Sequence, residues 1–422
     1  MTVVETMNQT QEKNAENGRS RIMFNPTQRQ LPAESRRDFL GTLAAGSMML
    51  AASARLSSAA DADPRVKEIL AATITVDMHN HGGIPPDARP PQSNAKSSAK
   101  KGADPAGSDA NAVEAMRLAG DSAICLAYAP DGPLLAVGAG EPAPGTRSNL
   151  IRDPKPGEMY QAHLNYLGKM DAALAQMNLA RALKYSDLEA AHKQGRPVVI
   201  QDAEGADFLE KGHLDRLEEA HKRGIRKLQL VHYAVNDIGD YQIGPVEHHG
   251  LSPFGAEVVK ECNRLGIMVD TAHCTFDTVK GAVKASSKPI LLSHTAVAGS
   301  KAQGTFWAEN FRGGLPTMQA RQVTPEHAKA VANTGGVIGI WHLFPSAEKY
   351  VQGVREMVEI VGADHVGIGM DWPIEGINHI WPGQTEGMMY AVVGEMLKQG
   401  FTKEECSKIA GGNFCRVFKA IA

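Results

Sequence analysis

The chain has 422 residues, of which 43% are hydrophobic, and a formal net charge of −3. This near-neutral balance excludes a broad basic surface for nucleic acid or for an anionic membrane. The five cysteines are an odd number without a CxxC pair, which argues against a disulfide framework or a zinc knuckle. A single α/β barrel can use a chain of this length.

The N-terminal segment has the features of an export signal. Residues 35–40 read Ser-Arg-Arg-Asp-Phe-Leu, which looks like the twin-arginine motif, and a short apolar stretch and small residues of the A-x-A kind follow. We therefore predict that residues 1–60 are a disordered leader with a signal peptide that engages the twin-arginine export machinery. The mature protein, residues 61–422, would be periplasmic or extracytoplasmic, or membrane-anchored if the signal stays uncleaved.

From residue 65 onward, short apolar runs alternate with segments of helical periodicity. The first half of this alternation predicts four strands, three helices and one long polar loop. In chain order they are a strand ending at His79, the loop 85–111, a strand at 122–129, a helix at 158–184, a strand ending at Glu204, a helix at 207–223, a strand ending at His232 and a helix at 253–265.

The second half continues the same pattern and predicts four more strands. In chain order its elements are a strand ending at His273, a helix at 275–286, a strand ending at His294, an insertion at 297–320, a helix at 325–333, a strand at 336–341, a helix at 346–361, a strand ending at Asp371, and helices at 386–399 and 403–420. Eight strand–helix units predict a (β/α)₈ TIM barrel. Both long insertions follow strands, so they would border a pocket at the carboxyl ends of the strands.

Side chains that bind divalent metals or move protons lie at the ends of six predicted strands. Parallel strands in one barrel bring these groups to one face, which predicts a metallohydrolase. The residues are His79, His81, Glu204, His232, His273, His294 and Asp371.

The residue types suggest which residues bind metal and which one moves protons. His79 and His81 are two apart in a strand, so they share a face and can bind one ion. Glu204 can bridge two cations, and His273 and His294 would complete the second ion. Asp371 would stay ionised beside two metals until it takes a proton from an attacking water.

His232 has two possible roles. A lone histidine at a strand end is often a structural residue with its hydrogen bonds satisfied. In this setting we favour electrophilic help, in which the ring donates a hydrogen bond to the substrate carbonyl as its oxygen gains charge.

Several longer motifs surround these residues. They are Gly250-Leu251-Ser252-Pro253-Phe254-Gly255, Asp270-Thr271-Ala272-His273, Leu292-Ser293-His294, Asp364-His365-Val366-Gly367-Ile368-Gly369-Met370-Asp371 and Gly412-Asn413-Phe414-Cys415-Arg416-Val417-Phe418. Together they resemble the membrane (renal) dipeptidase family of the amidohydrolase superfamily, and the combination is far more specific than any single histidine.

The resemblance implies a homodimeric enzyme with two Zn²⁺ ions per chain that hydrolyses dipeptides. His79 and His81 match the family's first metal pair, Glu204 the bridging carboxylate, and His273 and His294 the ligands of the second metal. Asp371 matches the catalytic acid/base, and His232 the carbonyl-polarising histidine. Arg321 falls where the family has an arginine that holds the substrate's terminal carboxylate, a task that suits a guanidinium.

The first-strand motif departs from the family, because His81 stands where these dipeptidases usually have aspartate. The segments after the first and sixth strands also differ. The resulting prediction is an exported zinc-dependent dipeptidase that acts through a metal-bridged hydroxide. Two alternatives stay open: an amidohydrolase that acts on another amide, a lactam or an ester, and a non-catalytic periplasmic protein that binds metal or peptide.

Overall fold

The structure is a computed structural model, and it describes residues 63–82, 112–135, 150–210, 212–304 and 319–422. The predicted signal segment and the loop 85–111 lie outside these residues. So does most of the insertion 297–320. The predictions for these segments therefore stay predictions. Among the described residues, no helix is both long and apolar enough to cross a membrane.

Eight parallel strands of the described chain close into a barrel. Closure follows because β2 pairs with β1 on one side and with β4 on the other, while β1 also pairs with β9. The predicted TIM-barrel fold is therefore confirmed. The strands are β1 Val76–Asn80, β2 Ala123–Tyr128, β4 Val198–Glu204, β5 Ile225–Gln229, β6 Met268–Asp270, β7 Leu291–Thr295, β8 Val337–Ile340 and β9 Val366–Ile368.

The strands are short and buried on both faces, as parallel strands in barrels are. β4 and β5 are buried at every residue, including the charged positions of each strand. A ninth, two-residue strand that we did not predict, β3 (Ala180–Arg181), pairs with the first two residues of β4. It extends the sheet without entering the closed ring.

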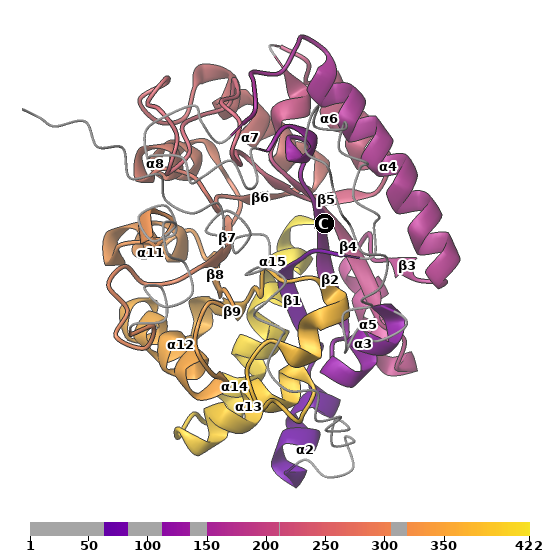
Figure 1. Ribbon diagram of the computed structural model, residues 1–422, viewed down its shortest axis with the longest axis vertical. Coiled ribbons are helices and arrows are strands. Elements are labelled where there is room, and N and C mark those ends of the chain that lie inside the picture. Colours follow the sequence, from indigo (N-terminus) through magenta and orange to yellow (C-terminus); the bar gives the residue numbers. More distant parts are fainter. Residues whose placement is uncertain (1–62, 83–111, 136–149, 211, 305–318) are drawn as a thin grey trace, which may run out of the picture. The chain divides into compact units, whose positions relative to one another are not determined.

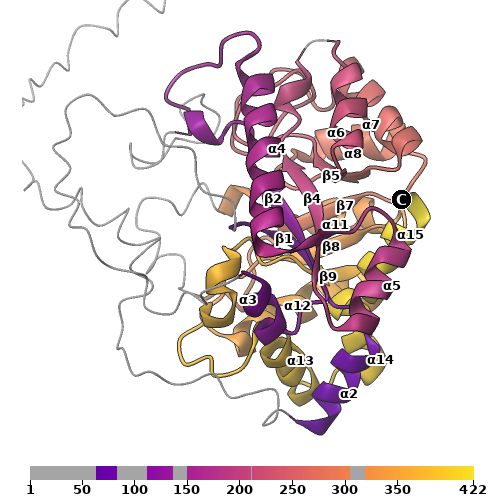
Figure 2. The ribbon, with the colours of Figure 1, turned by 90° about the vertical axis from the view of Figure 1, so that its right-hand side faces the viewer.

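Helices lie around the outside of the strands, as Figures 1 and 2 show. Six of the twelve α-helices of the described chain begin with a side-chain cap, for example Ser252 before α7 and Thr324 before α11. The α-helices of the described chain are α2 Pro64–Ala72, α3 Ala112–Ala119, α4 Glu158–Met177, α5 Tyr185–Gln194, α6 Asp215–Lys222, α7 Pro253–Leu265, α8 Phe276–Ala285, α11 Pro325–Ala332, α12 Ala347–Val361, α13 Met388–Lys398, α14 Lys403–Ser407 and α15 Asn413–Ile421.

Two predicted helices were wrong in extent because residues with positive φ end them. The helix predicted at 158–184 ends at Met177, where Asn178 takes a left-handed conformation, and β3 and α5 follow. The helix predicted at 207–223 is a 3₁₀ turn at 207–209 and then α6, since Glu210 and Gly212 both have positive φ. We did not predict α2, α3 or α5.

The last predicted helix, 403–420, is also divided. α14 passes into a π-helical turn, Lys408–Gly412, and α15 then begins at Asn413. At Gly411 the backbone approaches Ile74 so closely that a Cβ atom would overlap the Ile74 carbonyl oxygen. The irregular turn thus lets the C-terminal segment lie against the start of β1.

A buried cluster closes the barrel where the strands begin. Early residues of the strands, among them Val198, Met268 and Leu291, pack with Phe414 and Phe418 of α15. This apolar plug fills the amino-terminal end of the barrel. The polar strand ends are therefore left to the opposite face.

Candidate active site

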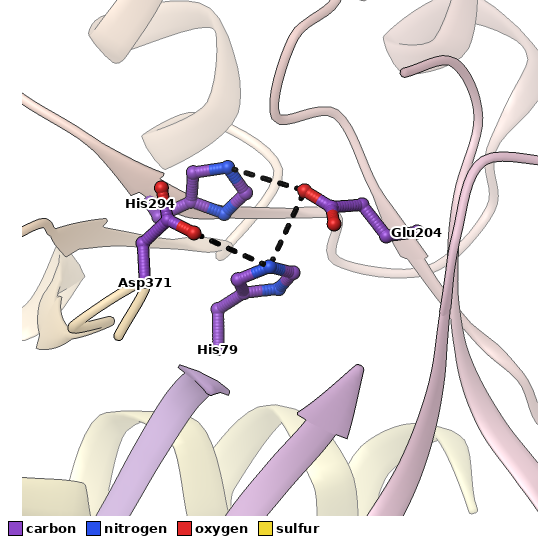
Figure 3. Close-up of side chains that lie close together, drawn as sticks. All are labelled: His79, Glu204, His294 and Asp371. Carbon is purple, nitrogen blue, oxygen red and sulfur yellow. Dashed lines mark ion pairs between the residues drawn. The ribbon is translucent and has the colours of Figure 1, made fainter. Parts of the chain in front are cut away.

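Four predicted site residues point toward one another at the carboxyl ends of the strands (Figure 3). His79 lies in β1, Glu204 closes β4, His294 lies in β7, and Asp371 follows β9. His79 Nε2 is 3.4 Å from Glu204 Oε1 and 3.9 Å from Asp371 Oδ1. His294 Nε2 is 3.8 Å from the same Glu204 oxygen.

Three of the predicted site residues lie beyond the strands rather than at their ends. His232, His273 and Asp371 each follow the last residue of β5, β6 or β9 by three positions. The predicted strand limits were therefore too long. His273 has φ 65° and Asp371 has φ 52°, a left-handed conformation that is uncommon for residues other than glycine. Tight turns at these two positions direct the side chains back over the barrel.

His81 lies at the rim of the group. Its Nε2 is 3.1 Å from Asp371 Oδ1 and 3.7 Å from Glu204 Oε2, and its side chain is 33% exposed. His79, by contrast, is fully buried. Both histidines of the HxH pair thus face the same two carboxylates, as their spacing predicts.

His273 completes the opposite side of the site. Its Nε2 is 3.1 Å from His294 Nε2 and 3.5 Å from Glu204 Oε1. Glu204 is therefore the common neighbour of His79, His81, His273 and His294, the position expected of a bridging carboxylate.

The donor set fits divalent metal ions. Two ligands that bind one tetrahedral ion at about 2.1 Å lie about 3.4 Å apart. The distances from Glu204 Oε1 to the Nε2 atoms of His79 and His273 are 3.4 and 3.5 Å. The buried Nε2 of His79 also has no hydrogen-bond partner in the structure, which is costly unless an ion uses its lone pair.

The two carboxylates and two of the histidines are held in the forms that bind metal. Burial would raise the pKa of Glu204, but His232 and His79 hold it well below its usual range. Burial likewise opposes ionisation of Asp371, and its pKa is kept low by His294, His81 and Arg321. Burial lowers the pKa of His273 to about 3 and that of His294 well below its usual value. Both rings are therefore neutral, as metal binding requires.

His79 is oriented by a carboxylate that the sequence analysis missed. Asp202 Oδ2 is 3.1 Å from His79 Nδ1, and both side chains are fully buried. This contact fixes the tautomer that leaves Nε2 free for a metal. An aspartate inside an otherwise apolar strand, two positions before Glu204, is the sequence signal that could have indicated it.

Asp131 is a second missed residue, and it orients His232. Its Oδ1 is 2.7 Å from His232 Nδ1, and its Oδ2 accepts hydrogen bonds from the backbone N–H groups of Tyr233 and Ala234. Burial opposes protonation of His232, but Asp131 and Glu204 raise its pKa to about 9. His232 therefore carries a proton that its Nε2 can donate toward the site.

Arg321 reaches the same cluster from a segment before α11. Its side chain is 6% exposed, and its Nη2 lies 2.7 Å from His273 Nε2 and 3.7 Å from Asp371 Oδ2. Nη1 donates to the hydroxyl of Tyr233 at 3.0 Å. The guanidinium thus stands at the edge of the metal-ligand group, within reach of a substrate bound there.

Another group of potential metal ligands shares His79 with the site and also contains Asp202 and Asp270. The ammonium of Lys227 occupies the space between the two aspartates, at 2.6 Å from each. Because a cation already lies between the two aspartates, we do not assign a further metal site to this group.

Comparisons with known proteins find a family model and similar chains. A family model described as membrane dipeptidase, peptidase family M19, matches residues 65–422. The dipeptidase tcpJ of Claviceps purpurea is 28% identical over 258 residues, which cover 56% of this chain and 56% of that protein. The dipeptidase verJ of Clonostachys rogersoniana is 26% identical over 215 residues, or 49% of this chain and 50% of that protein. The chain thus matches only about half the length of these curated relatives.

Solved structures share the fold. The probable dipeptidase PvdM of Pseudomonas aeruginosa has a TM-score of 0.63 at 17% identity, with 85% of this chain and 99% of that chain covered. A metallopeptidase of Rhodobacter sphaeroides, liganded with a phosphinate mimic of the dipeptide L-Ala-D-Ala, has a TM-score of 0.57 at 20% identity, with 73% and 89% covered. Since the family model spans nearly all of the described residues, the chain belongs to the membrane dipeptidase family of metallopeptidases.

Proposed function

We propose that the protein is a zinc-dependent dipeptidase that holds two Zn²⁺ ions per chain. The observation that carries the proposal is the placement of Glu204 among four histidines, with Asp371 beside them. One ion would take His79, His81 and Glu204, and the other Glu204, His273 and His294. Bound divalent ions supply a water molecule of lowered pKa and polarise the scissile carbonyl.

The residues of the chain would carry the remaining steps of peptide hydrolysis. Asp371 is ionised, so it can take a proton from the attacking water and pass it to the leaving amine. His232 is protonated and can donate a hydrogen bond to the carbonyl oxygen as negative charge develops there. Both groups face Glu204 and its histidines, so the carbonyl carbon would lie between them.

Arg321 would select substrates with a free carboxylate. Its guanidinium can form paired hydrogen bonds with a carboxylate, and its contact with Tyr233 holds it beside the site. A terminal carboxylate one residue beyond the scissile bond would favour dipeptides over longer peptides. The phosphinate bound by the Rhodobacter sphaeroides relative is a mimic of a dipeptide.

The test is hydrolysis of a panel of dipeptides by zinc-loaded protein, with D-residues included at the C-terminal position. We expect turnover of at least one dipeptide and little of its C-terminal amide, because the amide lacks the carboxylate for Arg321. Asp371→Asn should lower kcat at least about 100-fold with zinc content unchanged, because it removes the proton acceptor. Wild-type turnover in the Asp371→Asn variant would contradict the mechanism.

The metal requirement is tested separately with Glu204→Gln. The amide is nearly isosteric but lacks the charge that two cations share, so we expect zinc content to fall below two ions per chain. Normal zinc content and activity in this variant would contradict the assignment of Glu204. Hydrolysis of amides, lactams or esters without any hydrolysis of dipeptides would favour the broader amidohydrolase reading.

We also propose that the protein is exported by the twin-arginine route, acts outside the cytoplasm and forms a homodimer. The Arg36-Arg37 pair and the small residues that follow it support export. Replacing both arginines with lysine should retain the protein in the cytoplasm, as fractionation would show. Light scattering on the mature protein, residues 61–422, tests the dimer, and a monomeric mass would contradict it.

A further inference from the structure

A lysine lies buried beneath the site between two aspartates. Lys227 Nζ is 2.6 Å from Asp202 Oδ2 and 2.6 Å from Asp270 Oδ2, and all three side chains are fully buried. The residues come from the neighbouring strands β4, β5 and β6, and Lys227 stands opposite Asp202 in the register. The barrel therefore encloses two negative charges and one positive charge.

Burying these three charged side chains costs the folded state free energy. Burial disfavours the ammonium, and Asp202 and Asp270 together raise the pKa of Lys227 above its usual value. Buried ion pairs of this kind are often no more stabilising than apolar side chains of similar volume. The contacts of the two aspartates indicate a role other than stability.

On one side the array reaches His79. The same oxygen of Asp202 that accepts from Lys227 is 3.1 Å from His79 Nδ1. A histidine that binds metal through Nε2 usually donates its other ring N–H to a carboxylate, which orients the ring and increases its basicity. Lys227 thus fixes the carboxylate that orients His79.

On the other side the array reaches His273 and His294. Asp270 Oδ1 accepts hydrogen bonds from the backbone N–H groups of Ala272, at 3.1 Å, and Ser293, at 2.9 Å. These residues directly precede His273 and His294, and the Ser293 hydroxyl is 2.9 Å from His294 Nδ1. Asp270 therefore holds the backbone on which both histidines of the second metal are carried.

We infer that Lys227 is a positioning residue that couples the two metal positions, because it holds the supports of His79 and of His273 and His294 at once. The inference rests on the proposed dinuclear site and names no contact of Lys227 with substrate. It predicts that losing the ammonium weakens zinc binding at both positions, although Lys227 touches no metal ligand itself.

The experiment measures zinc binding to metal-free protein by competition with a chromophoric chelator. We expect Lys227→Met to lose about 10- to 100-fold in affinity for both zinc ions, the usual effect of removing an outer-shell support. Cobalt added to the same variant should give an altered absorption band, since the ligand geometry changes. Circular dichroism establishes that the variant is folded.

Arg226→Met is the matched control. Arg226 is the neighbouring residue on β5, but its guanidinium bonds the carbonyls of Leu183, His221 and Ile225, away from the site. This variant also removes a cation from the strand. We expect it to keep wild-type zinc affinity even where its thermal stability falls.

Two further variants keep the inference testable if Lys227→Met does not fold. Asp202→Asn should weaken chiefly the zinc held by His79, and Asp202→Asn combined with Lys227→Met and Asp270→Asn removes every charge of the array and should weaken both zinc ions. Wild-type affinity for two zinc ions in folded Lys227→Met or in the folded triple variant would overturn the inference. If the wild-type chain binds no zinc, the proposed function itself fails.

Discussion

The contact between Asp131 and His232 orients the proposed catalytic histidine and favours its protonated form, with the Nε2 proton directed into the site. Asp131→Asn keeps the shape but removes the charge that favours the imidazolium. We expect kcat to fall about 10- to 100-fold, with KM and zinc content little changed. Steady-state kinetics with zinc analysis checks this. Asp121→Asn alters another buried aspartate, outside the site, and should leave kcat as it is.

His327 gives the stability of the protein a defined pH dependence. It is buried in the first turn of α11, and burial lowers its pKa to about 4 from an ordinary value of 6.5. The helix N-terminus also disfavours a positive charge there. Between these values the unfolded state binds the extra proton, so the free energy of unfolding should fall as pH falls from about 6.5 to 4, by up to about 3 kcal/mol.

Denaturant unfolding at several pH values checks this prediction, with His327→Leu as the comparison. The variant cannot take up that proton, so its stability should change less with pH over the same range. Burial also lowers the pKa of other histidines, such as His163, so part of the pH dependence of stability remains in both proteins. Equal slopes in the variant and the wild type would contradict the assignment to His327.

At the scale of the elements, the backbone of β8 and the residue that follows β9 lie close to Ser293 of β7. A Cβ atom at Gly339 or at Gly369 would overlap the carbonyl oxygen of Ser293. Gly339→Ala should therefore destabilise the protein by about 1–3 kcal/mol and weaken zinc binding, since Ser293 adjoins His294.

Thermal unfolding and zinc titration of Gly339→Ala test this, with Gly394→Ala as control. Gly394 lies inside α13, where a Cβ atom would make only an ordinary contact with Val66 at 3.8 Å. Alanine is the better helix former by about 0.5–1 kcal/mol, so the control should be at least as stable as the wild type. A stable Gly339→Ala variant with normal zinc affinity would show that β7 can move.

The sequence was informative where the strands carry both hydrophobic and ligand-type residues. Runs ending at Glu204 and near His294 predicted the barrel and the converging site. Helix limits at 158–184 and 207–223 failed because single residues such as Asn178 and Glu210 take positive φ, which sequence periodicity does not reveal. Lys227 and Asp131 escaped notice because their partners are distant in the chain and meet them only in the closed barrel.

At the scale of the whole molecule, the proposed metal ligands connect remote parts of the chain. His79 and His81 come from its beginning, Glu204 from its centre, and His273 and His294 from later strands. Ions that bind this set only in the folded state stabilise the entire barrel. At a free zinc concentration 1,000 times the Kd, the gain is about 4 kcal/mol.

Removal of zinc with a chelator should accordingly lower Tm by several degrees, and added zinc should restore it. Differential scanning calorimetry measures the change. Glu204→Gln supplies the control, because a chain that cannot share the bridging charge should respond little to zinc. An unchanged Tm of the wild-type protein after complete metal removal would contradict metal binding by the folded state.

The left-handed backbone at His273 and Asp371 has a consequence for the engineering of this protein. Each such residue costs of the order of 1 kcal/mol that glycine would not incur. A selection for thermal stability alone would therefore favour glycine at these two positions and discard a proposed metal ligand and the proposed catalytic acid/base. We expect these two turns to lower folding stability while they hold residues of the proposed site in place. Both positions should therefore be left unchanged in any attempt to raise the thermal stability of the protein.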